Sequence, residues 1–190
     1  MAATLEREIK LFFDNPAGAR AAVVATGATP LRCRRLQEDN LFDTPDETLR
    51  RRGCALRVRS ESGKSLLTFK GPAQISPMKL REEHETVVSD GDELKKVFAE
   101  LGFEPWFRYQ KYREEFAAED VTIAVDETPI GTFIEVEGGE AAIHAVAQAL
   151  GRTSADFIVE SYRSLFLKRR EQYGLTGNDM VFADELGVTP

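Results

Sequence analysis

The chain has 190 residues, 42% of them hydrophobic and 30% charged, with a formal net charge of −7. This balance excludes a disordered chain, and the acidic charge argues against a nucleic-acid surface, because phosphate backbones bind basic faces. No apolar run is long enough to span a membrane, so we expect a cytoplasmic protein without membrane contact. The two cysteines, Cys33 and Cys54, lack the spacing of a zinc site and are expected to be free thiols. Any anion site must therefore be a local concentration of lysine and arginine.

The length suits a single domain, which we expect over residues 1–174, followed by a C-terminal tail over residues 175–190. Four segments with helical periodicity and capping or glycine residues at their ends predict helices over residues 16–27, 89–102, 138–151 and 154–174. Period-2 patterns predict eight strands in mostly antiparallel order, over residues 4–13, 35–43, 54–60, 65–71, 80–88, 107–116, 120–126 and 132–138. The expected fold class is α+β.

The first predicted strand carries charges at alternate positions. In "LEREIK", Glu6, Glu8 and Lys10 share one face of an extended strand, whereas Leu5 and Ile9 share the other. For one strand alone, a solvated sheet face is the simplest interpretation. Later segments repeat the alternation, which makes that interpretation harder to keep.

The hairpin "LRVRSESGKSLLTFK" repeats the alternation with positive charges. If Ser60 pairs with Ser65 across the turn, then Arg57, Arg59 and Lys70 share one face. Like charges so close together destabilise a sheet unless an anion or carboxylates lie among them. Further charges of this kind follow in later strands: Arg81, Glu83, Glu85, Lys111, Arg113, Asp126, Glu135 and Glu137.

These charged faces converge if the sheet curls into a barrel. We expect an eight-stranded antiparallel β tunnel, a closed or nearly closed barrel, with helices packed on its outside. Asp126 joins the same interior if Ala124 pairs with Glu135 across the last hairpin. A dry, empty interior of this kind would be unstable. A water-filled tunnel for a highly charged anion, with carboxylates for a divalent cation, would satisfy the charges.

The order of the charged blocks resembles a known family. "LEREIK" is similar to the E-x-E-x-K signature of the CYTH superfamily, the triphosphate tunnel metalloenzymes, which include class IV adenylate cyclases, thiamine triphosphatases and inorganic triphosphatases. The later blocks follow in the family's order, as "LRVR", "LLTFKGP", "REEHE", "KYR", "VDETPIGTFIEVEG" and "SYRSLF". The resemblance runs from Glu6 to about Phe166. One departure is Leu41, where family members often have tyrosine.

The resemblance implies a small-molecule triphosphate substrate and a divalent cofactor, Mg²⁺ or Mn²⁺, inside the tunnel. The catalytic residues that it implies are Glu6, Glu8 and Lys10. The substrate-binding residues are Lys10, Arg57, Arg59, Lys70, Arg81, Lys111 and Arg113, of which Arg81 matches less specifically. The metal ligands are Glu6, Glu8, Asp126, Glu135 and Glu137, and Glu8 is also a candidate for positioning the attacking water.

Three interpretations of the function remain open. We favour hydrolysis of a triphosphate, which would be tripolyphosphate, thiamine triphosphate or a nucleoside triphosphate, because "NLFDTPDETLRRRG" resembles the hydrolase members. A class IV adenylate cyclase, which converts ATP to cyclic AMP and pyrophosphate, is the alternative, since it uses nearly the same phosphate cradle. A non-catalytic polyphosphate-binding module would not need the acids, which are all present. Trp106 and the phenylalanines are predicted to be core rather than a base-stacking surface.

Overall fold

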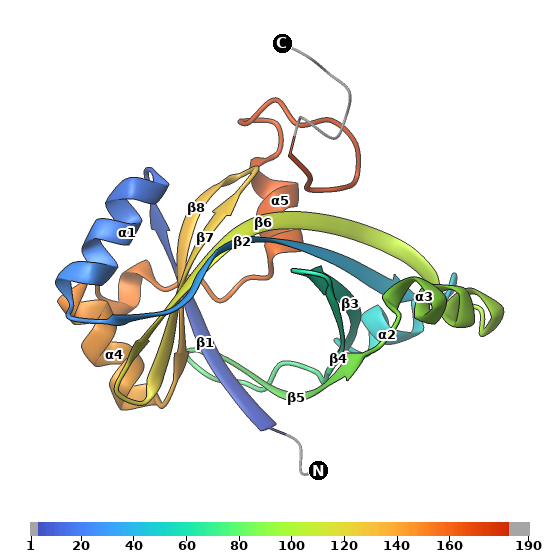
Figure 1. The fold of residues 1–190 in the computed structure, drawn as a ribbon, viewed down its shortest axis with the longest axis horizontal. Coiled ribbons are helices and arrows are strands. Elements are labelled where there is room, and N and C mark those ends of the chain that lie inside the picture. The colour runs from blue at the N-terminus through green and yellow to red at the C-terminus, as the bar shows by residue number, and fades with distance from the viewer. Residues whose placement is uncertain (1–3, 183–190) are drawn as a thin grey trace.

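Eight antiparallel strands form a closed barrel in the computed structural model, which describes residues 4–182 (Figure 1). The order of the strands around the barrel is β1-β5-β4-β3-β2-β6-β7-β8. Their bounds are β1 (Thr4–Phe13), β2 (Thr29–Asp43), β3 (Ala55–Glu61), β4 (Lys64–Lys70), β5 (Lys79–Val88), β6 (Glu104–Ala118), β7 (Val121–Thr128) and β8 (Gly131–Gly138). The predicted α+β barrel is confirmed, with β2 and β6 longer than expected.

The register of the strands confirms the pairings on which the expected interior depends. Ser60 pairs with Ser65 in the β3–β4 hairpin, and Ala124 pairs with Glu135 in the β7–β8 hairpin. Between β5 and β8, β1 closes the barrel, and Lys10 lies opposite Glu135. Because side chains alternate between the two faces of a sheet, these registers turn the charged positions of neighbouring strands toward the same side.

Three helices cover the outer, apolar face of the barrel, and Figure 1 shows them on opposite sides of the ring. The helices of the chain are α1 (Pro16–Ala25), the single turn α2 (Thr48–Arg51), α3 (Gly91–Glu100), α4 (Glu140–Ala149) and α5 (Tyr162–Arg169). On one side, α1 and α4 pack over β1, β7 and β8, with Val23 and Ile143 against Ile9 and Ile134. On the other side, Phe98 of α3 packs with Val58 and Phe42. Each fully buried aliphatic side chain contributes about 1.5–3 kcal/mol.

The fifth helix has a different position, because it packs against side chains that face the interior. Tyr162 and Phe166 of α5 form a cluster with Phe107 and Phe133. Phe107 has the parity of Lys111 on β6, and Phe133 has the parity of Glu135 on β8, so both rings point inward. An aromatic cluster and α5 therefore fill part of the barrel interior beside the charged residues.

The predicted helix over residues 154–174 is wrong in its first half. The chain makes one 3₁₀ turn (Ser154–Asp156), then extends, and α5 begins only after Ser161, whose side chain accepts the amide of Ser164. The extended part has a partner: the backbones of Ile158 and Lys10 exchange two hydrogen bonds of 2.9 Å. The pairing of β5 with β1 ends at Glu8, so Ile158 takes over the edge of β1 that β5 leaves free.

The segment after α5 also packs on the barrel. Met180 is fully buried, and its backbone carbonyl accepts the amide of Gln110 in β6 at 2.8 Å. Residues 183–190, the end of the expected tail, lie outside the described residues. Within residues 4–182, no helix is long and apolar enough to cross a membrane.

Candidate functional site

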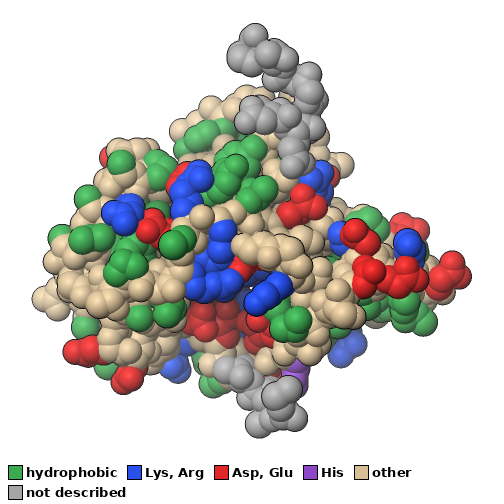
Figure 2. Space-filling view, in the orientation of Figure 1, with side chains coloured by type: hydrophobic (Ala, Val, Ile, Leu, Met, Phe, Trp, Pro, Cys, Tyr) green, Lys and Arg blue, Asp and Glu red, His purple; other side chains and the backbone are tan. Residues whose placement is uncertain are grey.

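The barrel encloses a cavity of about 810 Å³, which is lined by side chains from β1 to β6, from β8 and from the first turn of α5. Figure 2 shows basic and acidic side chains gathered in the central hollow of the molecule. The sequence-predicted site residues that line the cavity are Glu6, Glu8, Lys10, Arg57, Arg59, Lys70, Arg81, Lys111, Arg113, Glu135 and Glu137. Asp126 is the predicted site residue outside this lining, and it lies buried behind the cavity wall.

Lys10 is a charged residue with almost no contact with solvent, since only 1% of its surface is exposed. Its Nζ lies 3.1 Å from Glu8 Oε1 and 3.3 Å from Glu135 Oε1. The ring of Tyr162 also faces the ammonium, with 5.1 Å between Nζ and the ring centroid. Burial disfavours the ammonium, but Glu8 and Glu135 outweigh this and raise the pKa of Lys10 above its usual value. Lys10 therefore keeps its positive charge at every physiological pH.

Glu8 lies between two ammonium groups, those of Lys10 and Lys79. Burial disfavours the carboxylate, but Lys10 and then Lys79 more than offset it and hold the pKa of Glu8 well below its usual range. Lys79 was not predicted as a site residue, because the expected strand begins at residue 80, one position too late. The period-2 pattern nevertheless includes Lys79, because this residue precedes Arg81 by two positions.

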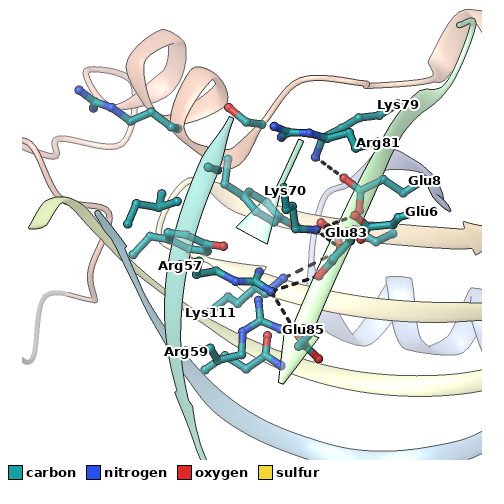
Figure 3. A pocket seen from close by; sticks show the side chains of 18 of the residues that line it. Glu6, Glu8, Arg57, Arg59, Lys70, Lys79, Arg81, Glu83, Glu85 and Lys111 are labelled. Atoms are coloured by element: carbon teal, nitrogen blue, oxygen red, sulfur yellow. Dashed lines mark hydrogen bonds and ion pairs between the residues drawn. The ribbon is translucent and has the colours of Figure 1, made fainter. Parts of the chain in front are cut away.

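Glu6 and Glu83 form a pair of acids on β1 and β5, bridged by Lys70 (Figure 3). The Nζ of Lys70 lies 2.6 Å from Glu6 Oε2 and 2.7 Å from Glu83 Oε2. Burial, together with a hydrogen bond between the two carboxyl groups, raises the pKa of Glu6 to about 7. Near neutral pH the Glu6 carboxyl is therefore protonated in a substantial fraction of molecules, and it shares this proton with Glu83 through their hydrogen bond.

The chemistry of this wall fits a hard divalent cation. Carboxylate oxygens are the ligands that Mg²⁺ and Mn²⁺ prefer, and Glu6, Glu8 and Glu83 present them from two adjacent strands. A cation can also replace the proton that Glu6 and Glu83 share. In the part of the chain that the structure describes, no three histidine, cysteine or acidic side chains already form a closed metal site. Lysines hold these carboxylates instead.

The raised pKa of Glu6 predicts a pH-dependent stability. A carboxyl group whose pKa rises on folding contributes stability that is complete below its unfolded pKa, near 4.5, and is lost as the pH rises through about 7. We therefore compare the free energy of unfolding of the wild type with that of Glu6→Gln in the absence of divalent cations. Between about pH 5 and pH 8, the value for the wild type should fall by roughly 1–3 kcal/mol relative to the value for the variant. Urea unfolding at several pH values measures this difference.

The control for this prediction is Glu82→Gln, since Glu82 is an exposed neighbour on the opposite face of β5. An equal pH dependence in the two variants would contradict a special environment at Glu6.

Two arginines of β3 share one buried acid. Arg59 Nε lies 2.9 Å from Asp39 Oδ1, and Arg57 Nε lies 3.3 Å from the same oxygen. Arg57 also donates to the hydroxyl of Thr68 at 3.0 Å. Burial disfavours the Asp39 carboxylate, but Arg59 and Arg57 outweigh this and lower its pKa. Arg57 also lies 3.5 Å from Glu85 Oε2 and 3.9 Å from Glu83 Oε1, so it links the β3 wall of the cavity to the acids of β5.

Asp126 is the centre of a buried network beneath the other cations. Its Oδ2 accepts Lys111 Nζ at 2.8 Å, Arg113 Nη2 at 2.6 Å and the Tyr162 hydroxyl at 2.6 Å. Burial, and then the charge of Arg113, lower the pKa of Lys111 to about 8. Tyr162 was not predicted as a site residue, because it lies on α5, outside any strand pattern. The assignment of Asp126 as a metal ligand stays a prediction.

Arg81 and Glu137 lie at the edge of the site. Arg81 donates to the carbonyl oxygens of Gly53 at 2.6 Å and Gly71 at 2.7 Å, so it joins two loops beside the cavity. Glu137 is exposed at the residue level although its side chain lines the cavity. The roles of Arg81 with substrate and of Glu137 with metal stay predictions.

Comparisons with known proteins agree with this geometry. The curated protein "Putative adenylate cyclase MJ0240" of Methanocaldococcus jannaschii is 34% identical over 105 residues, which are 55% of this chain and 60% of that protein. This chain thus matches less than two thirds of the length of that relative. The solved PH1012 protein of Pyrococcus horikoshii has a TM-score of 0.74 at 26% identity, over 84% of this chain and 98% of that one.

A more distant structure has the same fold. It is the "putative adenylyl cyclase HpAC1" of Hippeastrum, which is described as having a dominant triphosphatase activity. Its TM-score is 0.65 at 16% identity, over 93% of this chain and 98% of that one. The profile of the CYTH domain matches residues 4–162, which is most of the chain. The protein therefore belongs to the CYTH family.

Proposed function

We propose that this protein hydrolyses a triphosphate inside the barrel cavity with the help of a divalent cation. The observation that supports binding of a triphosphate is the convergence of basic side chains from five strands on one cavity: Lys10, Arg57, Arg59, Lys70, Lys79, Lys111 and Arg113. A triphosphate carries its negative charges along one short chain, and ammonium and guanidinium groups are the ligands that neutralise phosphate oxygens. Phosphoryl transfer depends mainly on such positioning and neutralisation.

The acidic wall has a separate task in this proposal. Glu6, Glu8 and Glu137, with Glu135 deeper in the cavity, would hold Mg²⁺ or Mn²⁺, and Glu83 is added to this set because of its bond to Glu6. When bound, the cation would neutralise phosphate oxygens as charge develops on them. We assign the positioning of the attacking water to Glu8, which lines the same wall of the cavity. We assign Asp126 to the positioning of Lys111 and Arg113.

A class IV adenylate cyclase is the second candidate, and it is supported by the name of the curated relative. In that reaction the ribose 3′-hydroxyl attacks the α-phosphorus and pyrophosphate leaves. The basic residues that line the cavity would bind the same three phosphates in either reaction, so their positions favour neither hydrolysis nor cyclisation. The difference between the two reactions is the phosphorus atom that is attacked.

Product analysis tests the proposal. The purified protein is incubated separately with tripolyphosphate, thiamine triphosphate and ATP in Mg²⁺ or Mn²⁺, and the products are separated by chromatography. We expect inorganic phosphate together with the corresponding diphosphate, and loss of all turnover in excess EDTA that added Mg²⁺ or Mn²⁺ restores. Cyclic AMP with pyrophosphate from ATP would establish the cyclase instead. No product from any of the three compounds would contradict both candidates.

A further inference from the structure

The ring of Tyr162 contacts two buried lysines of the cavity. The Nζ of Lys10 lies 5.1 Å from the ring centroid, and the Nζ of Lys111 lies 4.9 Å from it. Only 1% of the surface of Lys10 and 2% of the surface of Lys111 is exposed. An ammonium is attracted by the negative face of an aromatic ring, and this attraction is strongest where water is excluded. One ring from α5 thus holds two cations that come from different strands, β1 and β6.

The carboxylates near these lysines do not by themselves fix the direction of the two ammonium groups. Both lysines share Glu135, whose Oε1 lies 3.3 Å from Lys10 and whose Oε2 lies 3.9 Å from Lys111. Ammonium groups that share one carboxylate repel each other, and each ends a flexible stem with many rotamers. The ring of Tyr162 fills space beside both groups. It therefore limits the directions in which either lysine can turn.

Tyr162 is itself held from several sides. Its hydroxyl donates to Asp126 Oδ2 at 2.6 Å. The ring of Phe133 meets it edge-on, with 5.6 Å between the centroids, and the centroid of Tyr109 lies 6.1 Å away. The backbone is fixed as well, because Tyr162 is the first residue of α5 and directly follows the capping residue Ser161. A side chain whose own rotamer is locked in this way can hold the groups that touch it.

We propose that Tyr162 is a positioning residue, whose ring keeps the ammonium groups of Lys10 and Lys111 directed at the phosphates of the substrate. This inference rests on the proposed action on triphosphates, in which both lysines bind phosphate oxygens. A displacement of about 1 Å in a group that aligns the reacting atoms can cost a factor of about 100 in rate. A purely structural role in the aromatic cluster would need the size of the ring but not its charge distribution. The two roles therefore differ in their response to a ring of similar size with an altered charge distribution.

Fluorination changes the charge distribution of the ring with little change in its shape. Tyr162→Phe removes the hydroxyl and keeps the ring, whereas trifluorophenylalanine at position 162 also withdraws negative charge from the ring face. Activity is measured in Mg²⁺ on the triphosphate that the wild type converts fastest. We expect Tyr162→Phe to keep kcat within about threefold of the wild type, and the trifluoro ring to lower kcat by a further factor of about five or more. KM should change less than about threefold, because the other basic residues still bind the phosphates.

The matched control is the same trifluoro ring at Phe133, which lies in the same aromatic cluster as Tyr162. Arg169, rather than a lysine of the cavity, lies over the Phe133 ring at 5.5 Å, and neither Phe133 nor Arg169 lines the cavity. The control adds the same volume and should leave kcat within about twofold of the wild type. Equal losses at the two positions, or no loss at position 162, would overturn the inference while turnover of a triphosphate still supported the proposed function. Absence of turnover by the wild type would overturn both.

Removal of the whole ring gives a second measurement. We expect Tyr162→Leu to lower kcat by about 10-fold or more in the folded protein, since both lysines then gain freedom to turn. Circular dichroism establishes that the variant is folded. A folded Tyr162→Leu protein with the kcat of Tyr162→Phe would contradict a positioning role for the ring. If Tyr162→Leu does not fold, the comparison of the fluorinated and unfluorinated rings decides the question.

Discussion

Lys10→Met should lower kcat on the preferred triphosphate by about 100-fold or more while the protein stays folded. Removal of one preorganised charge from a water-excluded site typically costs a factor of about 10²–10³ in rate. Methionine fills most of the volume of the lysine without its charge. Glu8 keeps Lys79 as a partner and Glu135 keeps Arg113, so neither carboxylate is left alone. Steady-state kinetics and circular dichroism measure the two parts of the prediction.

Lys64→Met is the matched control for this variant. Lys64 lies exposed in the β3–β4 hairpin and does not line the cavity, so the same chemical change there should leave kcat unchanged. A folded Lys10→Met protein with a kcat within about threefold of the wild type would contradict a catalytic role for Lys10. Loss of a charge that stabilises the transition state lowers kcat by more than this factor.

Asp126→Asn should cause the largest loss of stability among isosteric changes in the site. The substitution leaves Lys111 and Arg113 with one acidic partner, Glu135, and breaking a buried ion pair in this way costs about 3–5 kcal/mol. For a domain of this size that corresponds to a fall in melting temperature of roughly 10 °C. Activity should fall as well, because both cations lose the group that orients them. Calorimetry and kinetics on the same preparation measure these effects.

Two further measurements decide how Asp126 acts. If Asp126 positions Lys111 and Arg113, a higher Mg²⁺ concentration should not restore the activity of Asp126→Asn. If Asp126 is instead a direct metal ligand, a higher Mg²⁺ concentration should partly restore this activity. Tyr162→Phe removes one of the three donors to Asp126 and keeps the ring beside Lys10, so it should cost only about 1–3 kcal/mol. A larger loss in Tyr162→Phe than in Asp126→Asn would contradict the central place of Asp126 in the network.

Much of the cavity could be predicted from the sequence, because side chains in a strand have a period of two. Charges at that spacing in several strands must share a face, and a closed barrel turns all those faces inward. This is why Glu6, Glu8, Lys10 and Arg57 were predicted to lie together and line one cavity. Lys79 obeys the same rule and was missed through a boundary that was wrong by one residue.

The remaining site residues depend on features that a period-2 pattern does not contain. Tyr162 reaches the cavity from a helix that begins after an extended segment, and its position follows from the pairing of Ile158 with Lys10. Trp106 reaches it through a bulge, which depends on the partner strand as much as on β6 itself. Such placements are set by contacts between distant segments, so local sequence does not determine them.

The pairing of Lys10 with Ile158 also bears on how the protein is made. These residues are 148 positions apart in the sequence, and Ile158 follows every strand of the barrel. During synthesis, β1 leaves the ribosome first but must wait for β5, β8 and finally the segment around Ile158 before both its edges are paired. Contacts between such distant segments form slowly. The nascent chain therefore carries the charges of the cavity in water until the segment around Ile158 has been synthesised, and the binding site is among the last parts of the barrel to assemble.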